Sequence, residues 1–341
     1  MPRLRRTDCS SPGIRRVRAG KGFSYVDADG HRVRDADELA RIRSLAIPPA
    51  WQDVWICPWP NGHLQATGID ARGRKQYRYH DAWRQRRDAE KFEHMVSFGE
   101  ALPMLREQVR DHLALDGMPA ERALACATRL LDLGFFRIGT EGYAEENESF
   151  GLATMRKSHV TLTDGVIRFD FPAKSGKRRI QSVVDDAVYE VVAELKARRG
   201  GGRELLAYRE DGDGGLWVDV KSGDINRYIK EVTGDEFTAK DFRTWNATTL
   251  AAVALAVSSR LRSESGKKRA VAHAMKEVAR YLGNTPAVAR KSYVDPRVVD
   301  RFNEGRTIAG ALADIGADAT FGQPSTQGAI EVAVLDLLRD D

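Results

Sequence analysis

Five short segments of this sequence combine basic residues with aromatic or amide side chains, a combination suited to binding a phosphate group and attacking it. In the last of them, Tyr293 follows Asn284 by nine residues. A tyrosine hydroxyl can act as a nucleophile, and a side-chain amide can donate a hydrogen bond to a phosphate oxygen. A lone tyrosine in a short helix is more often a packing residue, so this segment by itself does not predict catalysis.

Three further segments present cations that could contact a phosphate. Arg137 follows two phenylalanines directly after a predicted helix end, and its rigid guanidinium fork suits phosphate oxygens; the alternative is a cation that interacts with the helix dipole. Lys174 lies in a basic turn, residues 172–179, that could reach a ligand while its strands stay anchored; the alternative is an ordinary solvated turn. Lys240 and Arg243 are three residues apart, about one turn of a helix.

The remaining segment, residues 70–84, alternates basic residues with aromatic residues and an amide. Basic groups neutralise phosphates, whereas tyrosine and glutamine can reach base edges or sugars. The alternative is an amphipathic strand that places both of its tyrosines in the core. The candidate nucleic-acid contacts in this segment are Arg74, Lys75, Gln76, Tyr77 and Tyr79.

Charge is distributed unevenly along the chain. Residues 1–91 hold 19 Lys and Arg against 11 Asp and Glu, and residues 255–299 hold 10 against 3. Residues 300–341 are acidic, with 3 basic and 8 acidic residues. Two basic regions around a nearly neutral middle favour a polyanion that is bound from two sides. Two unrelated solvated faces are an equally weighted alternative.

Several familiar kinds of site have no signature in this sequence. The chain contains no GxxxxGKS or GxxxxGKT phosphate loop, no HExxH zinc motif and no GxSxG nucleophile motif. Its 3 cysteines form no CxxC pair, which argues against a zinc site or a disulfide framework and favours a reducing cytoplasm. No apolar run approaches the roughly 18 residues that span a bilayer. If this chain is an enzyme, we therefore expect it to use no ATP, no bound metal and no other cofactor, and we expect no membrane partner.

The predicted secondary structure that positions these residues changes from strands to helices near residue 85. Before that point, short apolar runs separated by turn residues predict a small β-rich domain, residues 1–85. Strands are predicted at 23–26, 54–57, 63–67 and 76–79, and a short helix at 35–44.

After residue 85 the periodicity becomes helical, which predicts a mainly α domain over residues 86–310. One helix is expected to begin at Pro119 and end at Gly134, and Asp185 is expected to cap another that continues to about Arg198. Further helices are predicted near Ser222, Leu250 and Lys267, the last ending at Gly283.

A β-hairpin insert interrupts these helices. Residues 160–162 pair with 166–169 across a tight turn, and a longer basic turn over 171–180 leads into a strand at 181–184. Residues 311–341 are predicted to form an acidic tail with a linker and a short helix. The predicted fold class is α+β, with a small β-rich N-terminal domain and a larger, mainly helical domain that carries the hairpin.

Taken together and in this order, the motifs resemble those of the type IB DNA topoisomerases in their short, poxvirus-like and bacterial form. The resemblance extends from about Ile47 to Asp295, which is most of the chain. The matching segments are Pro48-Pro49-Ala50-Trp51, Gly62-His63-Leu64-Gln65-Ala66-Thr67-Gly68, Arg74-Lys75-Gln76-Tyr77, Phe136-Arg137-Ile138-Gly139, Lys174, Lys240-Asp241-Phe242-Arg243-Thr244 and Ser292-Tyr293.

The resemblance implies an enzyme that relaxes supercoiled duplex DNA without ATP or metal, through a 3′-phosphotyrosyl intermediate. It implies a catalytic domain like that of tyrosine recombinases and type IB topoisomerases, which closes around the DNA together with the N-terminal domain. It also implies a monomer in the bacterial cytoplasm, associated with the nucleoid. The implied catalytic residues are Tyr293, Arg137, Lys174, Arg243, Asn284 and Lys240, and the implied DNA contacts are those of residues 74–79 together with Tyr143 and Lys291.

Asn284 departs from the pattern of the viral and eukaryotic members, many of which carry a histidine there. An amide still donates a hydrogen bond to a phosphate oxygen, but it neither carries a positive charge nor exchanges a proton. The resemblance therefore implies a working site in which this position is not a general acid.

Two other functions are compatible with parts of the pattern. A tyrosine recombinase shares the Arg, Lys, Arg and Tyr chemistry, but it typically carries a histidine two residues before the second arginine, where this chain has Asp241. A non-catalytic DNA-binding protein would explain the basic regions, but it would not be expected to retain a workable residue at every site position.

Overall fold

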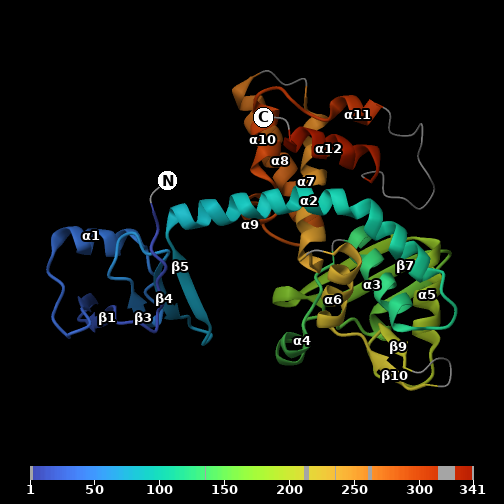
Figure 1. The fold of residues 1–341 in the computed structure, drawn as a ribbon, viewed down its shortest axis with the longest axis horizontal. Coiled ribbons are helices and arrows are strands. Elements are labelled where there is room, and N and C mark those ends of the chain that lie inside the picture. The colour runs from blue at the N-terminus through green and yellow to red at the C-terminus, as the bar shows by residue number, and fades with distance from the viewer. Residues whose placement is uncertain are drawn as a thin grey trace. The chain divides into compact units, whose positions relative to one another are not determined.

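A computed structural model describes residues 3–134, 136–210, 215–234, 236–259, 263–313 and 327–339 of the protein (Figure 1). The chain divides into two compact units, Met1–Glu93 and His94–Asp341. The division falls inside a 33-residue helix, α2 (Asp81–Leu113), which also contains the boundary expected near residue 85. Among the described residues, no helix is long and apolar enough to cross a membrane.

The N-terminal unit is built on a five-stranded antiparallel sheet with the strand order β2-β1-β3-β4-β5. One helix, α1 (Ala36–Ser44), begins where the side chain of Asp35 accepts a hydrogen bond from the backbone N–H of Glu38. The strands are β1 (Ile14–Ala19), β2 (Gly22–Val26), β3 (Gln52–Ile56), β4 (Leu64–Ile69) and β5 (Lys75–Tyr79).

The predicted helix and four predicted strands of this unit are confirmed, whereas β1 was not predicted. Half of the residues of β1 are arginines, and only Ile14 is buried, so β1 lacks the regular alternation of apolar and polar residues that marks a strand. This segment is a strand because its main chain forms antiparallel hydrogen-bonded ladders with β2 on one side and β3 on the other. A strand that depends on its neighbours has little signal in its own sequence.

Gln65, a residue of the motif over residues 62–68, has a structural role in this unit. Gln65 is only 3% exposed, and its amide nitrogen donates to the backbone carbonyls of Trp59, Pro60 and Gly62 at 3.2, 3.1 and 2.7 Å. These bonds fix the turn between β3 and β4. The core beneath the sheet consists of Ile14, Ile42, Val54, Ile56 and Ala66.

The C-terminal unit is mainly helical and carries two small sheets, ordered β6-β7-β8 and β10-β9. Its helices besides α2 are α3 (Ala120–Gly134), α4 (Glu141–Asn147), α5 (Asp186–Ala197), α6 (Ser222–Thr233), α7 (Ala239–Ala256), α8 (Glu264–Leu282), α9 (Pro286–Ser292), α10 (Pro296–Asn303), α11 (Ala309–Ala313) and α12 (Ala329–Arg339). Its strands are β6 (Val160–Thr163), β7 (Val166–Ala173), β8 (Lys177–Val184), β9 (Ala207–Arg209) and β10 (Trp217–Asp219).

The predicted helix ends of this unit are confirmed where a single residue determines them. Helix α3 starts directly after Pro119, and Asp185 caps α5 by accepting a hydrogen bond from the N–H of Val188 at 3.0 Å. Helix α8 ends at Gly283, whose φ of +64° is a left-handed conformation that favours glycine.

The prediction of a long turn over residues 171–180 is wrong. Strand β7 continues to Ala173, β8 begins at Lys177, and only Lys174–Gly176 lie between them. The inward-facing side chains Ile167, Phe169 and Phe171 remain buried to the end of β7, so the apolar alternation holds the two strands together almost to the tip. Lys174 is therefore presented on a short turn at the end of a rigid hairpin.

The predicted short helix near the C-terminus is present as α12, and it is a packed element. Ile330, Val334 and Leu338 are at most 2% exposed. Helix α12 contacts α7, α10 and α11, beside which Figure 1 draws it. The part of the predicted tail at residues 314–326 lies outside the described residues.

Candidate active site

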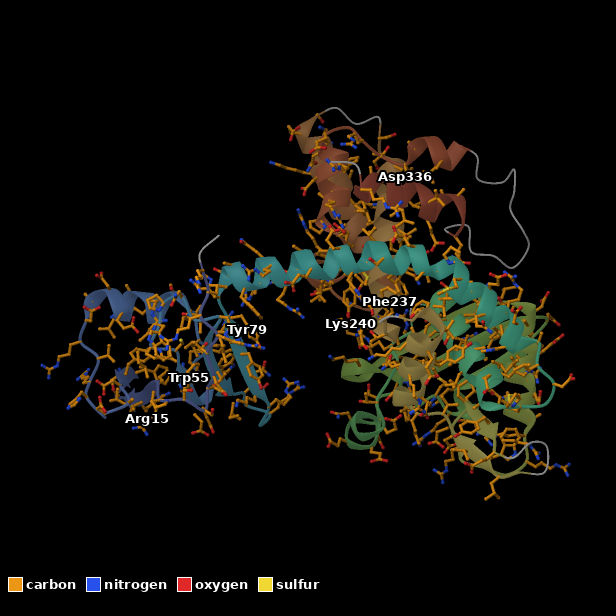
Figure 2. All side chains as sticks on the ribbon, in the orientation of Figure 1. Arg15, Trp55, Tyr79, Phe237, Lys240 and Asp336 are labelled. Atoms are coloured by element: carbon orange, nitrogen blue, oxygen red, sulfur yellow. The ribbon has the colours of Figure 1, made fainter. Side chains whose placement is uncertain are left out.

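Five segments of the C-terminal unit supply the six predicted catalytic residues. Tyr293 follows the end of α9, and Lys240, which Figure 2 labels, lies in the first turn of α7. The others are Arg137 in the loop after α3, Lys174 in the turn between β7 and β8, Arg243 on α7, and Asn284 between α8 and α9.

The structure brings five of these six residues to one pocket of about 320 Å³, whose lining includes no carboxylate: Arg137, Lys174, Lys240, Arg243 and Tyr293. Asn284 joins the group through Arg137, whose Nη2 donates to the Asn284 Oδ1 at 2.6 Å. Four cations around one phenol form a pocket that suits a phosphate anion.

Helix α7 determines where its two cations lie. At its start, the Asp241 carboxylate accepts hydrogen bonds from the backbone N–H and the hydroxyl of Thr238, at 2.8 and 2.9 Å. This cap places Lys240 on the exposed side of the first turn and Arg243, only 3% exposed, on the buried side. The Nη2 of Arg243 then donates to the carbonyl of Leu282 at 2.9 Å, which joins α7 to the end of α8.

Tyr293 is attached to α7 through its backbone. Its carbonyl accepts a hydrogen bond from the Thr248 hydroxyl at 3.2 Å, and the N–H of Asp295 donates to the same hydroxyl at 3.1 Å. The phenol ring lies 5.5 Å from the guanidinium carbon of Arg243. Nucleophile and arginine are therefore held by the same helix.

Opposing effects determine the pKa values of Tyr293 and Arg243. Burial raises the pKa of the Tyr293 phenol, but the charges and hydrogen bonds of Arg243 and Arg137 together outweigh burial and leave that pKa below its ordinary value of 10.0. Burial and the neighbouring charge of Arg137 lower the pKa of Arg243 to about 10, against the opposing effect of Tyr293. The pocket therefore favours a negative charge.

Strand β5 carries the predicted DNA contacts of the N-terminal unit, at one edge of its sheet. Tyr77 and Tyr79 are 47% and 37% exposed and stack with their ring centroids 6.1 Å apart, so the alternative that they belong to the core is wrong. Asp70 binds Arg74 at 2.8 Å and Gln76 at 2.9 Å. Hydrogen bonds from Arg74 lower the pKa of Asp70 to about 2. Figure 2 labels Tyr79 on this strand.

The remaining predicted contacts are Lys75, Lys291 and Tyr143. Lys75 and Lys291 are exposed, and the Lys75 Nζ lies 3.3 Å from the Cys9 Sγ. Tyr143 belongs to α4, but its side chain lies outside what the structure describes.

Sequence reasoning missed a second pocket beside the first. It measures about 280 Å³ and shares Arg137, Lys174 and Arg243 with the Tyr293 pocket. Arg179 and Arg280 line this pocket but not the Tyr293 pocket. The available signal was the run of cations in the hairpin, but a run does not reveal which side chain turns inward.

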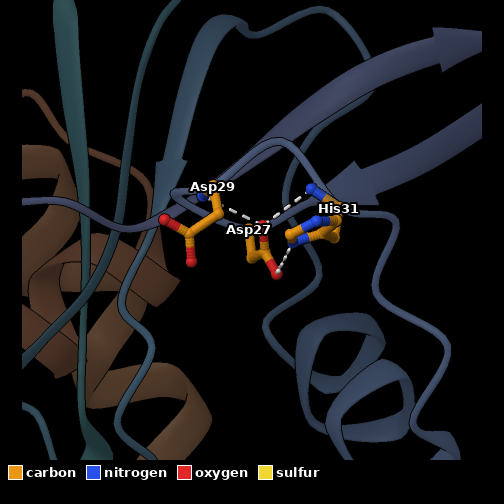
Figure 3. A group of neighbouring side chains, drawn as sticks. All are labelled: Asp27, Asp29 and His31. Atoms are coloured by element: carbon orange, nitrogen blue, oxygen red, sulfur yellow. Dashed lines mark hydrogen bonds and ion pairs between the residues drawn. The ribbon is translucent and has the colours of Figure 1, made fainter.

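One group of potential metal ligands occurs among the described residues, in the N-terminal unit (Figure 3): Asp27, Asp29 and His31, with ligand atoms within 4.8 Å of one another. An Oδ1 of Asp27 already accepts hydrogen bonds from the backbone N–H groups of Asp29 and His31, at 3.0 and 2.8 Å. These bonds are those of a turn stabilised by an aspartate. We assign no function to this group.

Two family models match the chain. Residues 80–309 match the catalytic core of eukaryotic DNA topoisomerase I, and residues 22–70 match the N-terminal domain of bacterial DNA topoisomerase IB. The first match covers the whole of both pockets and the second covers most of the N-terminal sheet.

Individual relatives agree with these models. A DNA topoisomerase 1B of Acanthamoeba polyphaga mimivirus is 35% identical over 287 residues, which is 83% of this chain and 85% of the relative. The DNA topoisomerase 1B of Vaccinia virus (strain Copenhagen) is 24% identical over 290 residues, which is 83% of this chain and 86% of the relative. A DNA topoisomerase 1 of Daucus carota is 29% identical over 211 residues, which is 59% of this chain and 24% of the relative.

Proposed function

This chain belongs to the type IB DNA topoisomerase family, and we propose that it relaxes supercoiled duplex DNA by cutting one strand with Tyr293 and rejoining it. The observation that carries the proposal is the single pocket in which the Tyr293 phenol lies with Arg137, Arg243 and two lysines. A phosphodiester placed there would have a nucleophile on one side and donors around its oxygens.

In the cleavage step, the Tyr293 oxygen forms a bond to the phosphorus while the bond from phosphorus to the 5′-oxygen breaks. The products are a 3′-phosphotyrosyl ester and a strand that ends in a 5′-hydroxyl. The phenol gives its proton to solvent, which is easier because Arg243 and Arg137 hold its pKa below the ordinary value. Nucleophilic catalysis of this kind replaces one difficult step by two easier ones.

Arg137, Arg243 and Asn284 stabilise the charge that develops on the nonbridging oxygens. The Oδ1 of Asn284 is occupied by Arg137, whereas its amide nitrogen is buried and has no hydrogen-bond partner among the described residues. A buried donor without a partner is costly, so it is suited to a ligand that completes it. A phosphate oxygen is that ligand in this proposal.

Lys174 protonates the leaving 5′-oxygen, and Lys240 supports that proton transfer. Lys174 is exposed at the tip of its hairpin but lines the pocket, so it can reach the leaving group. A positioned general acid of this kind typically contributes about 10²–10⁴-fold to the rate.

Religation reverses these steps. The phosphotyrosyl ester conserves the free energy of the broken phosphodiester bond, so no ATP is consumed. The cations of the pocket supply the charge stabilisation for which other enzymes use metals. While the strand is open, its free end rotates, which relaxes supercoils of either sign.

The N-terminal unit completes a clamp around the duplex in this proposal, with β5 as its DNA-binding strand. We assign residues 1–85 to the clamp domain, 86–310 to the catalytic domain and 311–341 to an acidic tail. We further propose that the enzyme acts as a monomer in the bacterial cytoplasm, on nucleoid DNA. The separate basic regions of the chain support a polyanion held from two sides.

A plasmid assay tests the proposal. The protein is mixed with negatively supercoiled plasmid in EDTA without ATP, and covalent adducts are trapped with detergent. We expect relaxation and a protein–DNA adduct from the wild type, and neither from Tyr293→Phe, which loses only the nucleophilic oxygen and should still bind DNA.

Two results would contradict the proposal. A strict requirement for magnesium or ATP would exclude this reaction class, and a Tyr293→Phe protein that still forms adducts would exclude this nucleophile. Recombinant products that join two duplexes would favour the recombinase alternative.

A further inference from the structure

The pocket of about 280 Å³ beside the Tyr293 pocket is strongly cationic. Seven of its thirteen lining residues are basic and none is acidic. These cations are Arg137, Lys174, Lys177, Arg178, Arg179, Arg243 and Arg280.

Arg179 is the half-buried cation in this pocket that lies outside the proposed mechanism. Its Nη2 donates to the backbone carbonyl of Tyr281, and its Nε donates to the Gln181 Oε1 at 3.2 Å. Its guanidinium lies directly over Gly283, because a Cβ placed there would come within 2.8 Å of its Nη1. Arg179 is therefore held against the end of α8, next to Asn284.

No carboxylate among the described residues forms an ion pair with Arg179. The neighbouring Arg178 differs, since its Nε and Nη2 each bind Asp170 at 2.6 Å. Burial and the charge of Arg137 lower the pKa of Arg179. A half-buried guanidinium beside other cations is unfavourable unless an anion binds with it.

We infer that Arg179 binds the DNA phosphodiester that lies one nucleotide downstream of the cleaved bond, on the strand that is released. This inference rests on the proposed function. Tyr293 lines only the larger pocket, whereas Lys174, the proposed acid for the leaving oxygen, lines both pockets. In an in-line displacement the leaving oxygen lies opposite the nucleophile, so the pocket that contains Lys174 and not Tyr293 receives the leaving strand.

Arg179 is a positioning residue in this arrangement. By holding the first downstream phosphate, it places the 5′-oxygen against Lys174 during cleavage and returns the 5′-hydroxyl to the phosphotyrosyl ester during religation. The guanidinium fork is suited to two oxygens of one phosphate, which a lysine cannot match.

The test compares single-turnover cleavage of two duplexes that share a cleavage site mapped with the wild-type protein. One has normal linkages, and the other carries an uncharged methylphosphonate at the first downstream linkage. The variants are Arg179→Ala, Arg179→Lys and a matched control, Arg168→Ala, which removes an exposed arginine from the same hairpin outside both pockets.

On the normal duplex we expect Arg179→Ala to slow cleavage by roughly 10- to 100-fold, the range for a lost hydrogen bond to a charged group. The methylphosphonate should slow the wild type by a similar factor and Arg179→Ala hardly further, since the contact is already absent. Arg179→Lys should retain part of the rate. Arg168→Ala should stay within about fivefold of the wild type, because exposed ion pairs contribute little.

Equal slowing of Arg179→Ala and the wild type by the methylphosphonate would overturn the inference, because a residue that only supports the end of α8 would act on both substrates alike. Equal cleavage rates of Arg179→Ala and Arg168→Ala on the normal duplex would also overturn the inference. If Arg179→Ala is unfolded by circular dichroism, the same comparison is decided with Arg179→Lys. A wild type that forms no covalent adduct at all would instead overturn the proposed function.

Discussion

Arg137 and Arg243 act on the Tyr293 phenol before any DNA is bound. Burial alone would raise the pKa of the phenol, but the two guanidinium groups outweigh it. The same two groups line the pocket in which we propose that the phosphate develops charge. In the proposed mechanism, one pair of cations would therefore both activate the nucleophile and stabilise the transition state.

The pH dependence of cleavage tests this double role. On a duplex whose 5′-bridging oxygen is sulfur, the leaving group needs no proton, so the rate should rise with pH through the pKa of the phenol, below 10.0 in the wild type. Arg137→Gln removes a charge and a hydrogen bond that lower this pKa, so the midpoint should move upward. The measurement is the single-turnover rate between pH 6 and about 11. Arg168→Gln should leave the midpoint in place, and an unmoved midpoint in Arg137→Gln would refute the role.

Lys174 can be separated from the arginines by the same sulfur substitution. On normal DNA, Lys174→Ala should slow cleavage by about 10²–10⁴-fold, the usual contribution of a positioned acid. On the sulfur duplex it should cleave almost as fast as the wild type, because a thiolate leaves without a proton. Arg137→Ala should remain slow on both duplexes, since the nonbridging oxygens still carry charge. Rescue of both variants, or of neither, would show that Lys174 is not the acid.

At the scale of elements, hydrogen bonds connect α12 to α7, which carries Arg243, and through Arg106 to α3, which precedes the loop of Arg137. Glu331 on α12 is 7% exposed and accepts hydrogen bonds from the Trp245 Nε1 at 2.8 Å and from Arg106 at 2.6 Å. Arg106 on α2 also donates to Asp132 on α3 at 2.9 Å. Trp245 is two residues beyond Arg243, so this buried network connects α12 to the helix that carries a site arginine.

We therefore expect a Glu331 substitution to lower the stability of the folded protein. Glu331→Ala leaves the indole N–H of Trp245 without its buried acceptor and leaves Arg106 with Asp132 as its partner. We expect the free energy of unfolding to fall by about 1–3 kcal/mol, the usual cost of an unsatisfied buried hydrogen-bonding group. Asp336→Ala is the matched control, since Asp336 is an exposed carboxylate on the same helix and should change stability by less than about 0.5 kcal/mol (Figure 2). Urea denaturation measures both values. Similar values for the two variants would mean that the network does not stabilise the unit.

At the scale of the whole molecule, the two basic regions of the chain lie mainly in different units, and the share of the N-terminal unit in DNA binding can be tested. Arg74→Ala together with Lys75→Ala should reduce the steepness with which affinity falls with salt, by about 0.9 in log–log slope for each lost phosphate contact. The matched control is Arg32→Ala together with Arg34→Ala, next to β2 at the opposite edge of the same sheet. Fluorescence anisotropy at several salt concentrations measures the slopes. An unchanged slope in the first double variant would remove β5 from the DNA-binding surface.

Local features of this protein could be predicted from the sequence because they depend on a few neighbouring residues. Pro119, Asp185 and Gly283 each mark a helix end through their own backbone or side-chain chemistry, and the structure confirms all three. The α+β fold class and the family followed from the order and spacing of motifs along the chain. The residues that meet at the pocket were identified by type, since few side chains other than tyrosine, arginine and lysine suit this chemistry.

The sequence by itself determined which residues are present and the helix ends that Pro119, Asp185 and Gly283 mark, whereas only the tertiary structure decided what each side chain faces. Burial and charge pairing depend on elements far apart in the chain, so no local pattern predicted that α12 is buried against α7, and the pattern of β5 left open whether Tyr77 and Tyr79 are exposed or belong to the core. For the same reason the sequence could not show that Arg178 pairs with Asp170, whereas Arg179 in the same cationic pocket has no carboxylate partner among the described residues. Adjacent residues on a strand point to opposite faces, and the packing around each face decides their roles.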